Sequence, residues 1–495
     1  MKKLNILVAG ILFLLAAACN KDDSTGANRA VAQVKVTGLK DTINVLTHQD
    51  FLKLNPVVEN ENDFDYYWTL TFNPDPWTAG TKVIRDTLAR TKDLNYEVLQ
   101  APGPYMLIFN VKEKSTGILE QFAMVVNINT LTGNGWYLVK ANGGKTDMDF
   151  IYPTGRIDNW IANFNEGKSQ DGNLVKALFV PAMKTSPTAT TQYNAFMVVS
   201  TNDVALYRID NGAMAMNFDN MFFTRPAVKK PQGAFQPISD GYLGFINDGR
   251  AYYLYKGTQF ANIPVNANNL VYDNLSPLTA SAAMDLGWNQ RTKSITGYNL
   301  TYIQELKANG SKLQNMNANL QWMAGYTGGR SVAMLLFRNA LDTGYLYKLN
   351  ANYPTLNGSG QMILIADTLK PEHDLMHADI IGGNYDVDLL YFAKGQEIYM
   401  MDVASATANL QFTLPAGETV TAIQHIKYPQ PATATTVNTL NYLAIATYKA
   451  GRYKVYLHTI SGTGTIPALP QPNFVGDGRV STIIYMEQGK GSRVF

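Results

Sequence analysis

A hairpin of one kind recurs along most of this 495-residue chain. Each copy is an apolar strand, a short polar turn and a second strand that often carries tyrosine. In one copy, Asn202 and Asp203 form the turn between residues 195–200 and residues 205–209. Asparagine, aspartate and glycine favour such turns because they tolerate backbone conformations that other residues avoid. The chain is therefore predicted to consist mainly of antiparallel strands.

The spacing of these hairpins narrows the choice of fold. The copies begin near residues 135, 195, 242, 332, 388 and 442. Most gaps are roughly 45 to 60 residues, the period expected of propeller blades, and the longer gap after residue 242 is expected to contain a degraded copy at residues 283–298. One blade cannot bury both of its faces, so blades stack into a ring. We therefore predict a β-propeller of about seven blades over residues 133–495.

Two further segments belong to this prediction. The last strand-like run, Val480–Met486, is expected to pair with the first blade and close the ring. Residues 301–307 (TYIQELK), followed by Asn309 and Gly310, predict a short helix inserted between strands. A stack of separate β-sandwiches is the alternative fold, although a sandwich does not require one hairpin to recur at a fixed period.

Residues 31–131 show a different all-β pattern. Residues 65–72 (DYYWTLTF) alternate large apolar and polar side chains, as a half-buried strand does. Two later runs, 103–111 (GPYMLIFNV) and 121–128 (QFAMVVNI), flank a turn and predict a hairpin. A central strand with tryptophan and a late hairpin, within about a hundred residues, predict an immunoglobulin-type sandwich over residues 31–131.

The first eighteen residues have the composition of a secretory signal peptide. Two lysines are followed by residues 4–18, an apolar run shorter than the about 20 residues that a stable membrane span needs. Three alanines precede Cys19, the only cysteine of the chain, which predicts cleavage at residue 18 and a thioether-linked lipid on Cys19. Residues 19–30 then form a flexible lipidated tether. An ordinary signal peptide with an accidental cysteine is the alternative.

Charge and cysteine content restrict the partners and the stabilising forces. Removal of residues 1–18 takes away two lysines and no acid, which leaves 39 basic and 39 acidic residues and a formal net charge of zero. Nucleic acids and anionic membranes select basic surfaces, so neither is expected as a partner. With Cys19 lipidated, no cysteine remains for a disulfide, and stability must come from burial.

Several residue groups were considered as candidates for chemistry. His373 and His377 stand four residues apart, which suits a metal on one helix face, although the zincin pattern is not met and a polar loop is the alternative. Three acidic pairs resemble parts of calcium loops without completing one: Asp63 and Asp65, Asp147 and Asp149, and Asp386 and Asp388. We therefore predict no catalytic residue, no metal site and no cofactor.

Aromatic side chains are the candidates for ligand contact. Four tryptophans could stack on sugar rings at a propeller face, namely Trp136, Trp160, Trp288 and Trp322. Aromatic residues at strand spacing often belong to the core, and that interpretation stays open for each of them.

The features together resemble a known family. Asn20-Lys21-Asp22-Asp23 resembles the export tag of surface lipoproteins of Bacteroidota, and residues 134–151 (NGWYLVKANGGKTDMDFI) resemble the entry into the propeller in PKD-like lipoproteins of that group. The resemblance implies an outer-membrane, cell-surface lipoprotein that is accessory to nutrient uptake, with a TonB-dependent transporter as a partner. The chain would then bind a glycan, a peptide or a partner protein without catalysis. A propeller hydrolase that cleaves glycans with channel carboxylates is the alternative.

Overall fold

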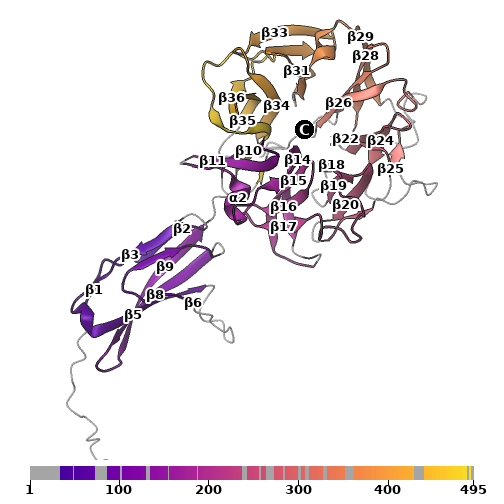
Figure 1. Cartoon of the computed structure of the whole chain (residues 1–495). Helices are drawn as coiled ribbons and strands as arrows, with labels where there is room; N and C mark the ends of the chain where they lie inside the picture. Colours follow the sequence, from indigo (N-terminus) through magenta and orange to yellow (C-terminus); the bar gives the residue numbers. More distant parts are fainter. Residues whose placement is uncertain are drawn as a thin grey trace, which may run out of the picture. The chain divides into compact units, whose positions relative to one another are not determined.

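The structure is a computed structural model, and the chain divides into two compact units, which Figure 1 shows as ribbons. The first unit comprises most residues up to Ile128, and the second comprises Asn129–Phe495. The predicted signal peptide, Cys19 and the tether lie outside the described residues. Those residues are 34–47, 50–72, 86–100, 103–129, 134–153, 155–184, 186, 188–236, 242–255, 258–262, 273–281, 285–298, 303–306, 312–326, 332–351, 362–384, 386–428, 440–487 and 490–491. In them no helix has the length and apolar character that crossing a membrane requires.

The first unit is a β-sandwich, as the sequence predicts. Its larger sheet has the order β2 (Thr42–Leu46), β9 (Leu119–Asn129), β8 (Gly103–Glu113), β5 (Phe64–Phe72) and β6 (Asp86–Ala89). Two short strand pairs complete it, β1 (Val36–Thr37) with β4 (Val57–Val58) and β3 (Phe51–Leu54) with β7 (Leu94–Glu97), and a 3-10 turn η1 (Glu61–Asp63) precedes β5. Trp68 lies in the core, and its indole N–H donates to the carbonyls of Thr91 and Lys92.

The second unit contains seven sheets within the described residues, and we number them as blades. Blade 1 is β38 (Arg479–Glu487), β10 (Asn134–Asn142), β11 (Lys145–Tyr152), β12 (Gly155–Ile157) and β13 (Gln170–Asp171), with helix α2 (Trp160–Phe164) beside it. Blade 2 is β14 (Leu174–Lys184), β15 (Gln192–Ser200), β16 (Val204–Arg208) and β17 (Met214–Asn217). Blade 3 is β18 (Pro231–Phe235), β19 (Tyr242–Asn247), β20 (Arg250–Tyr255) and β21 (Ala261–Asn262).

The other four blades have the same four-stranded order. Blade 4 is β22 (Leu275–Ala280), β23 (Asp285–Asn289), β24 (Ser294–Tyr298) and β25 (Ile303–Glu305). Blade 5 is β26 (Asn319–Tyr326), β27 (Val332–Arg338), β28 (Gly344–Asn350) and β29 (Ile363–Leu369). Blade 6 is β30 (Ile380–Gly383), β31 (Leu389–Lys394), β32 (Glu397–Asp402) and β33 (Thr407–Thr413), and η2 (Asp374–His377) precedes it. Blade 7 is β34 (Thr419–Tyr428), β35 (Leu440–Lys449), β36 (Arg452–Thr459) and β37 (Phe474–Asp477).

The blades close into a ring, which confirms the predicted propeller (Figure 1). One inner strand of each blade contacts that of the next, in the order β38, β14, β18, β22, β26, β30, β34 and back to β38. We call these seven strands the channel wall. In blade 1 the short strand β39 (Lys490–Gly491) also pairs with the remaining edge of β38. The predicted closure is also confirmed, because β38 pairs with β10, for example Ile484 with Tyr137. Each hairpin predicted from the sequence forms the two middle strands of a blade.

The predicted helix at residues 301–307 is wrong. Ile303–Glu305 is strand β25, which pairs with the edge of β24 through Tyr298 and Ile303, and through Thr296 and Glu305. The sequence contains good helix formers, but the edge of β24 offers unpaired backbone groups that a fourth strand satisfies. Blade geometry therefore overrides local helix propensity here.

Candidate functional site

The channel wall carries a repeated irregularity in its backbone. Six of its seven strands have a β-bulge in their pairing with the second strand of the blade, and β30 is the one with regular register. The extra residues are Val175, Gln232, Ser276–Leu278, Gln321, Thr421 and Ser481. A bulge bends its strand and redirects side chains, and bulges often lie beside functional sites. The sequence gives no signal for them, because they depend on strand pairing.

In β18 and β34 the residue that follows the bulge faces the next blade and is small. In β18 this residue is Gly233, where an added Cβ would lie 2.8 Å from the carbonyl oxygen of Pro277 in blade 4. In β34 it is Ala422, which packs between blades 7 and 1. Gly382 stands at the corresponding place in β30, and an added Cβ there would lie 2.4 Å from the carbonyl oxygen of Ile423. Adjacent wall strands therefore approach closely at this level.

Two long side chains occupy the position after the bulge in blades 2 and 5, Lys176 in β14 and Trp322 in β26. Each directly follows its bulge, and each is partly exposed. Lys176 lies two residues before Leu178, which packs between blades 2 and 3, so strand alternation puts both on one face. Trp322 packs against the cluster between blades 5 and 6.

Lys176 is a cation without a counter-charge. In the described part of the chain its ammonium has neither a hydrogen bond nor an ion pair. Burial lowers the pKa of Lys176 to about 8, because the charged form loses solvation in the channel wall. The side chain is therefore still mostly charged at neutral pH, and an anion beside it would stabilise that charge.

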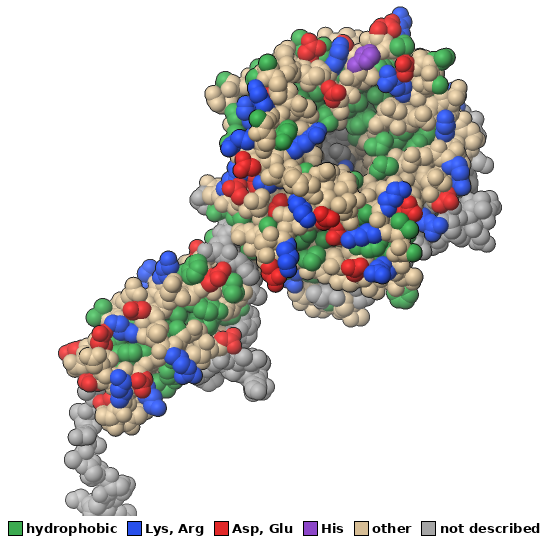
Figure 2. Space-filling model, in the orientation of Figure 1, with side chains coloured by type: hydrophobic (Ala, Val, Ile, Leu, Met, Phe, Trp, Pro, Cys, Tyr) green, Lys and Arg blue, Asp and Glu red, His purple; other side chains and the backbone are tan. Residues whose placement is uncertain are grey.

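The channel wall as a whole is basic. Its described strands carry the basic side chains Lys176, Lys184, Lys427 and Arg479, together with His425, against the single acid Glu487. Lys427 forms an ion pair with Asp386. Figure 2 shows a hollow at the centre of the ring, with hydrophobic and basic side chains at its edge. The hollow therefore suits an anionic ligand better than a cationic one.

The four tryptophans that the sequence suggests as ligand contacts differ in exposure and in ring contacts. Trp160 and Trp288 are 2% and 3% exposed and pack in the clusters between blades, where Trp288 contacts the ring of Phe337. Trp136 is partly buried, with its ring centroid 4.9 Å from that of Tyr485. Trp322 is partly exposed and has no ring contact within the described residues. Ligand contact by these tryptophans stays a prediction, and Trp322 is the one whose ring is most available.

Asp149, one of the acids considered for calcium, is fully engaged by protein donors. It accepts from Lys140 at 2.6 Å, Arg156 at 2.7 Å and the Tyr453 hydroxyl at 2.8 Å. The backbone N–H of Asn159 also donates to it. We call Lys140, Asp149, Arg156 and Tyr453 the closure cluster, because the first three belong to blade 1 and Tyr453 belongs to blade 7. Its role in the structure is to join the ends of the ring.

The neighbouring acid Asp147 has a local structural role. Its carboxylate accepts from the backbone N–H groups of Ile161 at 2.8 Å and Ala162 at 3.2 Å, at the start of α2, and from the Ser169 hydroxyl at 2.6 Å. Burial raises the pKa of Asp147 despite these bonds. The carboxylate thus supplies the acceptor that the first turn of a helix lacks.

Three of the other residues singled out for metal binding also have protein partners. Asp386 and Asp388 form ion pairs with Lys427 and Lys348. His373 precedes η2, where its Nδ1 accepts from the Leu375 N–H and its Nε2 contacts the Ala406 carbonyl oxygen at 2.9 Å. In the described ranges no group of three or more His, Cys, Asp or Glu side chains is arranged to hold a metal ion.

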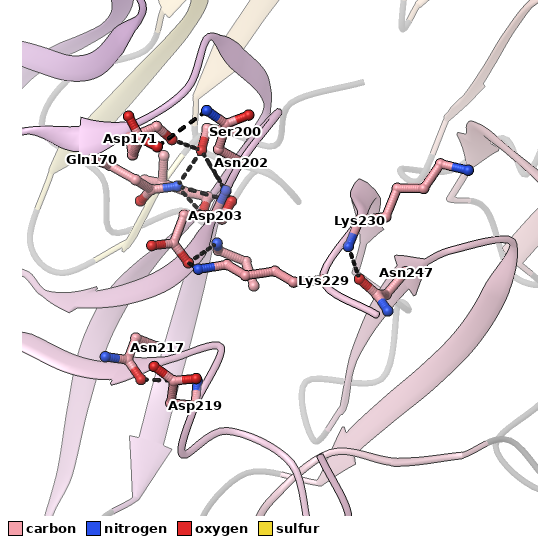
Figure 3. A network of polar contacts seen from close by, with 12 residues as sticks. Gln170, Asp171, Ser200, Asn202, Asp203, Asn217, Asp219, Lys229, Lys230 and Asn247 are labelled. Carbon is pink, nitrogen blue, oxygen red and sulfur yellow. Dashed lines mark hydrogen bonds and ion pairs between the residues drawn. The ribbon is translucent and has the colours of Figure 1, made fainter. Parts of the chain in front are cut away.

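A polar network joins blades 1, 2 and 3 near the turn between β15 and β16 (Figure 3). The Gln170 amide donates to the Ser200 hydroxyl at 3.1 Å and to the Asp203 carbonyl at 3.2 Å. The Asp203 carboxylate pairs with Lys229 at 2.7 Å. Gln170 and Ser200 are buried, and their polar atoms satisfy one another. This network helps to hold the three blades in register.

Comparison with known proteins adds one family. Residues 20–173 match the model of the PKD-like family. The match covers the first unit and continues through β10–β13 of blade 1, so it includes the junction that the sequence analysis singled out. No relative is found among the curated proteins.

Several solved structures are similar in fold. One is a quinoprotein alcohol dehydrogenase-like protein from Bacteroides thetaiotaomicron, with 12% identity, a TM-score of 0.42 and coverage of 91% of this chain and 98% of that chain. Another is AztD from Citrobacter koseri, with 9% identity, a TM-score of 0.37 and coverage of 73% and 99%. A third is PorZ, a surface component of the type-IX secretion system of Porphyromonas gingivalis, with 11% identity, a TM-score of 0.34 and coverage of 80% and 51%.

Proposed function

We propose that this protein is a lipid-anchored cell-surface binding protein, and that the ring of its propeller presents the binding site. In this proposal Cys19 carries the lipid, and the chain serves an uptake system in the outer membrane together with a TonB-dependent transporter. The observation that carries the binding role is the channel wall, where Lys176 has no partner in the described part of the chain and Trp322 is partly exposed.

The acids support binding rather than hydrolysis. A glycosidase needs two carboxylates about 5 to 10 Å apart and facing the substrate. On the described strands of the channel wall the only acid is Glu487, which accepts from the Tyr485 hydroxyl at 3.0 Å. Asp147 and Asp149 are engaged in holding α2 and the ring. Four of the carboxylates named in the sequence analysis therefore have structural partners, namely Asp147, Asp149, Asp386 and Asp388.

The anchor is supported by the start of the chain. The match to the PKD-like family begins at residue 20, directly after Cys19. Replacing Cys19 with alanine should release the protein from the membrane fraction, because no other lipid attachment site is available in a chain with one cysteine. Protease treatment of intact cells should remove the wild-type protein. Equal membrane retention of wild type and Cys19→Ala would refute the anchor.

The binding role is tested with purified residues 24–495. The protein is incubated with a panel of polysaccharides and peptides, and both retention and product release are measured. Retention of a panel member without turnover is the expected result. Time-dependent release of products would show instead that the propeller is a hydrolase, and absence of any retention would contradict a binding role for these ligand classes.

A further inference from the structure

The propeller has a site for one chemical class of ligand at the level of its bulges. Resting on the proposed binding function, we propose that this part of the channel binds an acidic saccharide. The carboxylate of a uronic acid lies against the ammonium of Lys176, and a sugar ring of the same chain lies against Trp322. Three observations support this assignment: the equivalent positions of Lys176 and Trp322 in their blades, the basic charge of the channel wall, and the aromatic and polar side chains at Trp322.

The positions of Lys176 and Trp322 favour joint action. Both directly follow the bulge of a wall strand, in blades 2 and 5, which lie across the ring from each other. At the equivalent position Gly233 and Ala422 are small, because the neighbouring wall strand is close. Both side chains are partly exposed, and the Trp322 ring also packs against the cluster between blades 5 and 6.

The charge of the wall favours an acidic ligand. Lys176 lies in a partly buried place without an anionic partner among the described residues, so an incoming carboxylate would form a charge-assisted hydrogen bond. Arg479 lies at the same end of the neighbouring strand β38 and is exposed. On the described wall strands the one acid, Glu487, lies at the opposite end of β38. A cationic or neutral ligand would leave the Lys176 charge uncompensated.

The aromatic and polar neighbours favour a saccharide over a simple anion. The indole of Trp322 presents an apolar body with a polar N–H, and that combination suits the C–H face and hydroxyl groups of a pyranose. Gln321 is exposed beside it, and its amide donates only a long bond of 3.3 Å to the Asn319 carbonyl. Hydroxyl groups of a sugar could therefore find both donors and acceptors next to the ring.

The experiment uses the mature chain and measures affinity by isothermal titration calorimetry. The probes are an oligogalacturonate, its methyl-esterified form, and an acidic peptide of equal charge. We expect the oligogalacturonate to bind and the neutral ester to bind at least about tenfold more weakly, since the charge-assisted contact is lost. Binding of the oligogalacturonate should weaken as salt is raised.

Variants locate the site. Lys176→Gln should weaken oligogalacturonate binding about tenfold or more, and Lys176→Arg should keep most of it, because the charge remains. Lys184→Gln is the matched control, because Lys184 lies at the other end of the same strand, and it should change little. Trp322→Leu keeps an apolar side chain against the cluster between blades 5 and 6 and should weaken binding by loss of the ring. Circular dichroism checks that each variant is folded.

The outcomes separate this inference from the proposed function. Equal affinity for the ester or the acidic peptide, or an unchanged affinity in folded Lys176→Gln, would overturn the acidic-saccharide site. If another polysaccharide of the panel is still retained, the proposed binding function stands alone. If nothing in the panel is retained, the proposed function fails as well.

Discussion

Asp149 illustrates how a single buried charge can hold a large ring together. The carboxylate is fully buried, and its donors Lys140 and Tyr453 are also buried, so water cannot replace any of them. Removing charges from water costs several kcal/mol per ion, and the mutual attraction compensates only when every donor is in place. The closure cluster meets that condition, and its members come from blades 1 and 7.

Replacing Asp149 with asparagine should destabilise the propeller by about 3 to 5 kcal/mol, because the Lys140 ammonium is left buried without its partner. Thermal unfolding followed by tryptophan fluorescence measures the effect. Asp171→Asn is the control. Its partner Lys145 is 56% exposed, and an exposed pair contributes less than about 1 kcal/mol. Similar melting temperatures for the two variants would contradict the role of the closure cluster.

The lowered pKa values of two buried histidines predict how the stability of the fold depends on pH. Burial lowers the pKa of His425 and of His458 below the ordinary value of 6.5, so both are neutral in the folded state at neutral pH. In the unfolded chain each takes up a proton near its ordinary pKa. Their contribution to stability is therefore complete above about pH 6.5 and is lost as pH falls toward the folded-state pKa.

The melting temperature should accordingly be lower at pH 5 than at pH 7.5. The double variant His425→Gln and His458→Gln should show a smaller difference between the two pH values, because neither glutamine titrates. The comparison is made between wild type and variant at both pH values. A pH difference of the same size in both proteins would show that other groups are responsible.

At the scale of secondary structure, local turn chemistry predicts the two middle strands of every blade. It predicts the edge strands less well. Turns such as Asn202-Asp203 and alternating strands appear directly in the sequence, and the structure contains these hairpins. The fourth strand of a blade pairs on one side only. Its sequence is less constrained, so residues 301–307 carry a helix-like pattern although Ile303–Glu305 is a strand.

The candidate site was predictable only in part. The sequence marks Trp322 as an aromatic candidate, whereas the importance of Lys176 depends on the bulge before it and on its position in the ring. The one available signal is a lysine inside the apolar run LVKALFV. A charged residue within a strand that is otherwise buried is a useful marker in such repeats, once the repeat period places the strand at the channel.

Because neighbouring wall strands pack closely, we expect an added methyl group to be destabilising at some of their glycines. Gly382→Ala would place Cβ 2.4 Å from the carbonyl oxygen of Ile423 in the next blade, and neither backbone can move without its sheet. We expect a loss of about 1 to 3 kcal/mol, as for other overpacked cores. Gly462→Ala is the matched control, because no atom lies within 4 Å of its added Cβ. Equal stability of the two variants would refute close packing of the wall strands.

At the scale of the whole molecule, blade 1 combines residues that are far apart in sequence. Its strand β38 comes from residues 479–487, and its strands β10–β13 come from residues 134–171. All of β10–β13 lies within the match to the PKD-like family, which ends at residue 173, whereas β38 does not. The ring is thus complete only after the chain has passed through the other six blades.

Removing β38 should therefore disrupt the propeller while sparing the first unit. β38 supplies Ile484 and Met486 to the cluster between blades 1 and 2, and Val480 and Ile483 to the cluster between blades 7 and 1; all four are fully buried. A chain that stops after Gly478 uncovers both clusters and leaves the β10 edge unpaired, at a cost of about 1.5 to 3 kcal/mol for each large apolar side chain exposed.

Limited proteolysis tests this expectation in one experiment with an internal reference. In the chain that stops after Gly478 the propeller should be digested quickly, while a fragment containing the first unit survives, because that unit has its own core around Trp68. A chain that stops after Glu487 keeps β38 whole and should resist digestion as the full chain does. Resistance of the shorter chain would show that six blades and an open seventh suffice, and that β38 is not what holds the ring closed.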